Sequence, residues 1–87
     1  MNYKVLRPTE IMSRCGLRSS AMNEAVGKGV LPPLFKVLGG RASGCFEHEL
    51  DEVLRARAAG ASDDEVRAIV LRQVEQRKAR VAHERAA

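Results

Sequence analysis

The chain has 87 residues, which is enough for one domain and too few for two. Its composition, 45% hydrophobic and 30% charged, is ordinary for a soluble globular domain. The net charge of +4 is concentrated in residues 1–46, which hold seven Lys and Arg residues against two Glu. Clustered positive charge attracts polyanions, either nucleic acid or an acidic membrane surface. Proteins that bind no polyanion can also carry a modest positive net charge.

Several classes of protein are excluded by what the sequence lacks. The N-terminus has no secretory signal pattern and no apolar run approaches the ~20 residues that span a bilayer, so we expect a cytoplasmic protein without a membrane partner. Cys15 and Cys45 are too few for a disulfide framework, and Cys45 with His48 lacks further metal ligands at a suitable spacing. We therefore expect no metal and no cofactor.

The acidic clusters do not indicate an enzyme. Glu47 with His48, and the run from Asp63 to Glu65, stand at expected helix starts, where acids stabilise the helix dipole and need no further role. No nucleophile–base set or phosphate-cradling loop accompanies them.

The first third of the chain predicts an extended lead over residues 1–7 and then two short helices. The first helix is expected over residues 9–14 and ends at Gly16, with Ile11 and Cys15 on its inner side. The second begins near Ser19 or Ser20, one of which is expected to be its N-cap, and it stops at Gly29. Two helices joined by a short Gly-containing turn have the spacing of a helix-turn-helix, although helix pairs of this kind also occur in unrelated folds.

A β-hairpin is expected next, over residues 35–46, with a two-residue turn at Gly39-Gly40. Pairing outward from this turn places Leu38 opposite Arg41 and Phe35 opposite Gly44. One face then holds Phe35, Val37, Ala42, Gly44 and Phe46 and should lie on the helical core. The other, mixed and basic, face holds Lys36, Leu38, Arg41, Ser43 and Cys45.

Two further helices complete the chain. The third is expected over residues 47–58, with Leu50, Val53 and Leu54 as its buried stripe. The "SDDE" sequence at 62–65 predicts a capping box, after which the fourth helix extends toward Val81. Its apolar stripe is expected to run along the side that carries Val66, Ile69, Val70, Val74, Arg77 and Val81. Residues 1–60 therefore form the expected domain, and residues 61–87 form an amphipathic helix that packs back on this domain or pairs with a second copy.

The order of these motifs resembles the AlpA-type phage and prophage regulators, small winged-helix proteins related to excisionases and to the DNA-binding domain of MerR-type regulators. The resemblance covers about residues 5–57, through "LRPTEIMSRCGLRSSAMNEAVGKGVLP", "KVLGGRASG" and "EHELDEVL". It implies a mostly α winged helix-turn-helix with a small β-hairpin. It also implies a sequence-specific transcriptional regulator of phage or mobile-element genes, for example a repressor, and sometimes an assistant to site-specific recombination.

Under this resemblance, the recognition helix falls on residues 19–28 and enters the major groove, and the wing falls on residues 35–46 and enters the minor groove. The expected DNA contacts are Arg18, Ser19, Ser20, Asn23, Lys28, Lys36, Arg41 and Ser43. Each also has a plainer interpretation as a helix cap, a solvated surface cation or part of a connecting hairpin. The chain departs from the family pattern at Asn23, Glu24, Gly27, Cys45 and Val53.

Glu24 and Gly27 weaken the expected DNA face, so a second hypothesis remains open. The same fold could be an interaction or architectural module that contacts an integrase or RNA polymerase and binds DNA weakly. RNA is a third option, disfavoured because no exposed aromatic platform is expected. If the chain binds double-stranded DNA, we expect a homodimer or a cooperative oligomer on it, because one such domain has a small footprint.

Overall fold

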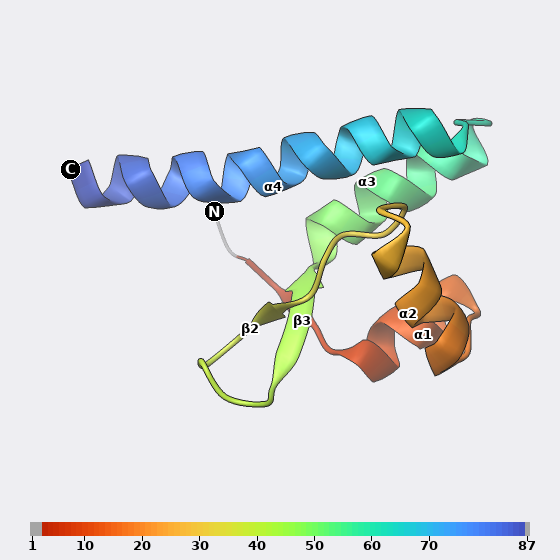
Figure 1. The fold of residues 1–87 in the computed structure, drawn as a ribbon, viewed down its shortest axis with the longest axis horizontal. Coiled ribbons are helices and arrows are strands. Elements are labelled where there is room, and N and C mark those ends of the chain that lie inside the picture. The colour runs from red at the N-terminus through yellow and green to blue at the C-terminus, as the bar shows by residue number, and fades with distance from the viewer. Residues whose placement is uncertain (1–2, 87) are drawn as a thin grey trace.

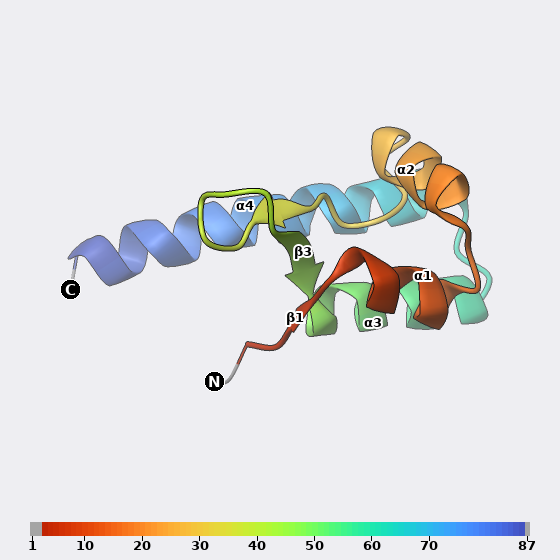
Figure 2. The same cartoon turned by 90° about the horizontal axis from the view of Figure 1, so that it is seen from below.

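The computed structural model describes the backbone of residues 3–86 and the side chains of residues 3–81. Within this range the chain is mostly helical, with four helices and one small three-stranded antiparallel sheet (Figure 1). The elements are β1 (Val5–Leu6), α1 (Pro8–Cys15), α2 (Ser19–Gly27), β2 (Phe35–Lys36), β3 (Ser43–Phe46), α3 (Glu47–Ala58) and α4 (Asp63–Ala86). α4 runs along one side of the molecule and packs against α3 (Figure 1), and the view from below shows α2 and α3 on opposite sides of α1 (Figure 2).

The first helix pair forms as the sequence predicts, with small shifts at the ends. α1 begins at Pro8, where proline fits the first helical position. Gly16 ends α1 in the left-handed conformation, with φ 66°, and α2 follows after a short turn. Ile11 on α1 and Met22 on α2 are buried, so each helix turns one apolar side inward.

The hairpin has the register that its glycine turn predicts. Phe35 pairs with Gly44 and Lys36 with Ser43, and the Val37 N–H donates to the Ala42 carbonyl at 2.9 Å. The N-terminal lead adds a strand that the sequence did not reveal, because β1 pairs with β3 and makes the sheet order β1-β3-β2. Residues 1 and 2 of the expected lead lie outside the described range.

The placement of Cys45 on an outer, mixed face is wrong. Cys45 pairs with Leu6, and both side chains are buried in the main core. The expectation treated the hairpin as a two-stranded ribbon with one outer face. In the structure β3 is the central strand, with β1 on one side and β2 on the other, and its end at Cys45 is buried. Phe35 and Phe46 are half-buried under the second half of α4.

One hydrophobic core joins the helices to the sheet. It comprises Leu6, Ile11, Met22, Leu31, Cys45, Leu50, Val53, Val66 and Val70. The members come from β1, α1, α2, β3, α3 and α4 and from the loop after α2. The first half of α4 is therefore part of the packing of the domain, since Val66 and Val70 lie in the same cluster as residues of α1 and β1.

The buried side of α4 differs from the expected apolar stripe in its second half. Gln73 is buried, and its side-chain amide donates to the Glu49 carbonyl at 3.0 Å and to the Glu52 carboxylate at 2.8 Å. Val81, expected in the stripe, is 46% exposed. Polar groups replace apolar ones here because the helix meets the start of α3, which presents carbonyl and carboxylate oxygens.

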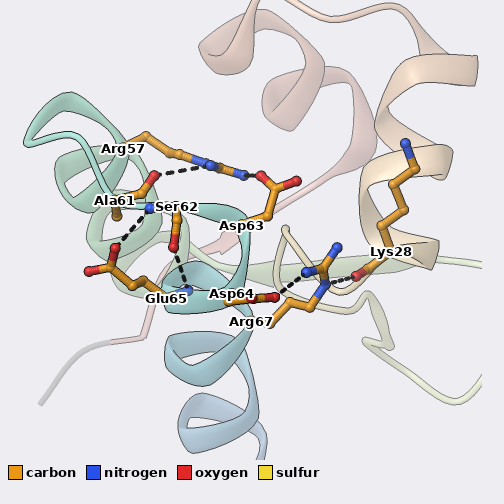
Figure 3. A network of polar contacts seen from close by, with 8 residues as sticks. All are labelled: Lys28, Arg57, Ala61, Ser62, Asp63, Asp64, Glu65 and Arg67. Carbon is orange, nitrogen blue, oxygen red and sulfur yellow. Dashed lines mark hydrogen bonds and ion pairs between the residues drawn. The ribbon is translucent and has the colours of Figure 1, made fainter.

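A network of polar contacts fixes the junction of α3 and α4 (Figure 3). The expected capping box is confirmed: the Ser62 N–H donates to Glu65 Oε1 at 3.1 Å and the Glu65 N–H donates to Ser62 Oγ at 3.2 Å. Arg57 bonds to Asp63 and to the Ala61 carbonyl. The direction of α4 is therefore set at its first turn.

Candidate nucleic-acid interface

The start of α2 is exposed and polar. Arg18 is the N-cap, with extended dihedral angles, and Ser19, Ser20 and Asn23 all lie on the surface. The expectation that Ser19 or Ser20 caps the helix is wrong, because the helix begins at Ser19 and no side chain bonds to its first amides. Both serines therefore lie within the first helical turn, after the N-cap position, so neither is the N-cap residue.

The far end of α2 is held against α4. Arg67 on α4 donates from Nε to the Lys28 carbonyl at 2.9 Å and from Nη1 to Asp64 at 2.8 Å (Figure 3). Gly29 follows with φ 77°, a conformation that favours glycine and ends the helix. With Met22 buried beneath it, α2 is fixed both at its inner face and at its C-terminal end.

Lys28, expected as a free phosphate contact, is paired. Its ammonium lies 2.8 Å from the Glu24 carboxylate one helical turn earlier. The hydrogen bond and the charge of Lys28 lower the pKa of Glu24, and Glu24 raises the pKa of Lys28 in return. The pair is exposed and nearly neutral, so Glu24 cancels the charge of Lys28 on this surface.

The hairpin presents its cations without acidic neighbours. Lys36 and Arg41 are exposed, whereas Ser43 is half-buried. The Ser43 carbonyl accepts a hydrogen bond of 2.9 Å from Nε of Arg7, the residue that precedes α1. Arg7 was not singled out from the sequence, and no local pattern could have found it, because the contact spans 36 positions.

Most cations elsewhere are neutralised by carboxylates. Salt bridges engage Lys4, Arg14, Lys28, Arg57, Arg67, Arg72, Arg77 and Lys78. Leaving aside Arg80, whose guanidinium lies over the Tyr3 ring, the cations within residues 3–81 that make no ion pair are Arg7, Arg18, Lys36, Arg41 and Arg55. Apart from Arg55 on α3, these unpaired cations stand at the start of α2 or on and beside the hairpin.

α2 and the hairpin project from the same side of the molecule. The N-terminal end of α2 and the tip of the hairpin both point away from α4 (Figure 1), and both elements lie on one side of the layer formed by α1, α3 and β1 (Figure 2). They are separated along the long axis, with α2 near the start of α4 and the hairpin beside its second half (Figure 2). The eight expected contact residues therefore divide into two groups, five on α2 and its caps and three on the hairpin.

A buried ion pair fixes the base of the hairpin. Arg77 on α4 bonds to both carboxylate oxygens of Glu49 and, at 3.0 Å, to the Pro33 carbonyl. Its guanidinium also lies 5.1 Å from the centre of the Phe35 ring and 5.9 Å from that of Phe46. α4 thus connects the start of α3, the loop before β2 and the hairpin in one polar contact.

The cysteines show no sign of a reactive or ligating role. Burial is the main cause that raises the pKa of Cys45 to about 12, and burial also raises the pKa of Cys15. Within residues 3–81 no three His, Cys, Asp or Glu side chains gather in a way that could hold a metal ion. Over the described part of the chain, no helix has the length and apolarity required to cross a membrane.

Comparison of the chain with models of known protein families, with curated proteins and with solved structures yields no match.

Proposed function

We propose that the protein binds double-stranded DNA and regulates transcription as a winged helix-turn-helix. α2 enters the major groove, with Arg18, Ser19, Ser20 and Asn23 nearest the bases and phosphates. The hairpin of residues 35–46 is the wing, and it reaches the adjacent minor groove with Arg41.

The distribution of unpaired cations carries this proposal. Ion pairs neutralise most Lys and Arg side chains outside the surface formed by α2 and the hairpin, whereas Arg18, Lys36 and Arg41 on that surface keep their full charge. Positive charge without an internal partner attracts phosphate and releases counterions from DNA when it binds. The uncapped first turn of α2 supports the same interpretation, because amides that no side chain caps can donate to a phosphate.

Asn23 is the proposed base reader. It is exposed on α2 five positions after the capping residue Arg18, and an Asn amide can pair bidentately with adenine in the major groove. Lys36 and Arg41 would position the protein on the backbone and in the minor groove, where narrow A·T-rich segments attract arginine.

A salt titration on duplex DNA tests the proposal. Fluorescence anisotropy with a labelled random duplex should show a dissociation constant that rises steeply between about 50 and 200 mM salt. Arg18→Ala and Arg41→Ala should each weaken binding about fivefold and reduce the salt slope by about one unit. Arg55→Ala is the matched control, because Arg55 is also unpaired and exposed but lies on α3. No duplex binding, or equal effects of all three variants, would overturn the proposal.

One observation favours the alternative of an interaction module. A groove of about 810 Å³ lies between the second half of α4 and the aromatic face of the sheet, and Tyr3, Phe35, Phe46 and His48 line it. Exposed grooves of this kind are often occupied by partner chains. A protein that binds no duplex at any salt concentration would favour this function over the regulator.

A further inference from the structure

Leu38 has an exposure that the fold does not explain. Its side chain is 88% exposed, against 68% for Leu71 and 46% for Val81. Leaving a leucine in water forgoes about 2 kcal/mol relative to burying it. Burial alternates from β2 into the turn, since Phe35 and Val37 are half-buried and Lys36 and Leu38 are exposed. Leu38 therefore stands on the outer face of the hairpin at its tip.

The tip is narrow and stands clear of the rest of the chain. Leu38 and Arg41 flank Gly39 and Gly40, which carry no side chains. A Cβ atom added at either glycine would meet nothing within 4 Å. The minor groove of B-form DNA is only about 6 Å wide, and a tip of two glycines is among the slimmest that a hairpin can present.

The charge around Leu38 indicates what it would contact. The hairpin of residues 35–46 contains Lys36 and Arg41 and no acidic residue, and both cations lack an ion-pair partner among the described residues. An apolar side chain between two unpaired cations matches the minor groove, in which phosphates line both edges and the faces of the base pairs lie within. Proteins that bend DNA insert leucine and similar wedges between base pairs there.

We propose that Leu38 inserts between two stacked base pairs from the minor groove and bends the duplex. The inference rests on the proposed function and adds to it a deformation of the DNA. Arg41 lies in the minor groove and Lys36 contacts a phosphate at its edge while Leu38 unstacks one step. Flexible pyrimidine–purine steps cost least to unstack, so such a step should stand in the bound site at the position of the hairpin tip.

The test uses a duplex of about 25 base pairs selected by the protein from a random pool. A 2-aminopurine at the suspected step reports unstacking, and a donor–acceptor pair on the duplex ends reports bending. The wild-type protein should raise 2-aminopurine fluorescence severalfold and increase energy transfer. Leu38→Ala should lose both signals while keeping its dissociation constant within about tenfold of the wild type.

Two further variants separate a wedge from a general loss of binding. Leu38→Phe should restore both signals, since phenylalanine also serves as a wedge. Leu71→Ala removes another exposed leucine, on α4, and should leave both signals unchanged. Wild-type binding without either signal, or wild-type signals from Leu38→Ala, would overturn the wedge alone. A wild-type protein that binds no duplex would overturn the proposed function as well.

Discussion

Gly44 is the residue at which the sheet tolerates no side chain. A Cβ atom at this position would overlap the Leu6 carbonyl oxygen and lie 2.8 Å from Cγ1 of Val5. β1 would have to move away from β3, so Gly44→Ala should destabilise the fold by about 2–3 kcal/mol. Thermal unfolding followed by circular dichroism measures the effect. Gly40→Ala is the control, because a Cβ there meets nothing, and equal melting temperatures for both variants would contradict this packing.

Glu24 limits the positive charge of the proposed DNA surface. Its carboxylate pairs with Lys28 at 2.8 Å, so Glu24→Gln should free the lysine and remove a repulsive charge. We expect binding to duplex DNA to tighten by about threefold to tenfold at low salt. Glu75→Gln makes the same charge change at another exposed Glu–Lys pair, on α4, and should have a smaller effect. Equal effects would show that only net charge matters.

At the residue scale, local chemistry was predictable and distant contacts were not. The left-handed Gly16 and the Ser62–Glu65 capping box follow from residue type and spacing along a few positions. The burial of Gln73 depends on oxygens of Glu49 and Glu52 that lie more than 20 positions away, so its sequence neighbours give no sign of it. The serines of α2 were misassigned because serine suits both an N-cap and the first turn.

Among the elements, α4 depends on a buried ion pair to brace the hairpin. The side chains of Arg77 and Glu49 are 18% and 3% exposed. Arg77→Ala would leave the Glu49 charge buried without a partner, so we expect a loss of about 3–5 kcal/mol in the free energy of unfolding. Chemical denaturation measures it. The double variant Glu49→Gln with Arg77→Met removes both charges and should lose less free energy of unfolding than Arg77→Ala alone. A larger loss would show that the unpaired Glu49 charge is not the cause of the destabilisation.

The junction of α3 and α4 should weaken in acid. The Arg57 hydrogen bond lowers the pKa of Asp63, and the hydrogen bonds from Ser62 lower the pKa of Glu65. A lowered pKa in the folded state gives stability that is complete above the ordinary values of 3.8 and 4.5 and is lost as the pH falls through the folded values. The melting temperature should therefore drop between about pH 5 and pH 3. The double variant Asp63→Asn with Glu65→Gln should show a shallower drop in melting temperature. The same pH profile in this variant and the wild type would show that these two carboxylates do not stabilise the junction.

The elements themselves were predictable to different degrees. The 47–58 helix and the hairpin register were confirmed, because a strong periodic pattern and a Gly-Gly turn fix them locally. β1 has only two residues, too short for any alternation to show. Because β1 pairs with β3, β3 is the central strand of the sheet and not an edge strand, and Cys45 is buried.

For the whole molecule, the sequence predicts a domain of residues 1–60 followed by an amphipathic helix that packs back on it or pairs with a second copy. The first half of α4 adds Val66 and Val70 to the common core and holds α2 through Arg67. Its second half extends past the sheet (Figure 1). Gln76, Arg77 and Arg80 of this half line the groove that Tyr3 also lines. We therefore expect the first half of α4 to be required for folding, and a second copy or other partner to meet the second half.

We propose that α2 and the hairpin bind neighbouring grooves of one duplex. Dimethyl sulfate reacts with guanine N7 in the major groove and with adenine N3 in the minor groove, so footprinting on a selected duplex reports both contacts at once. We predict a protected patch of guanines next to protected adenines within about one helical turn. In the Arg41→Ala variant the adenines should react with dimethyl sulfate again, while the guanines stay protected. Protection confined to one groove, or adenine protection that survives Arg41→Ala, would contradict the account.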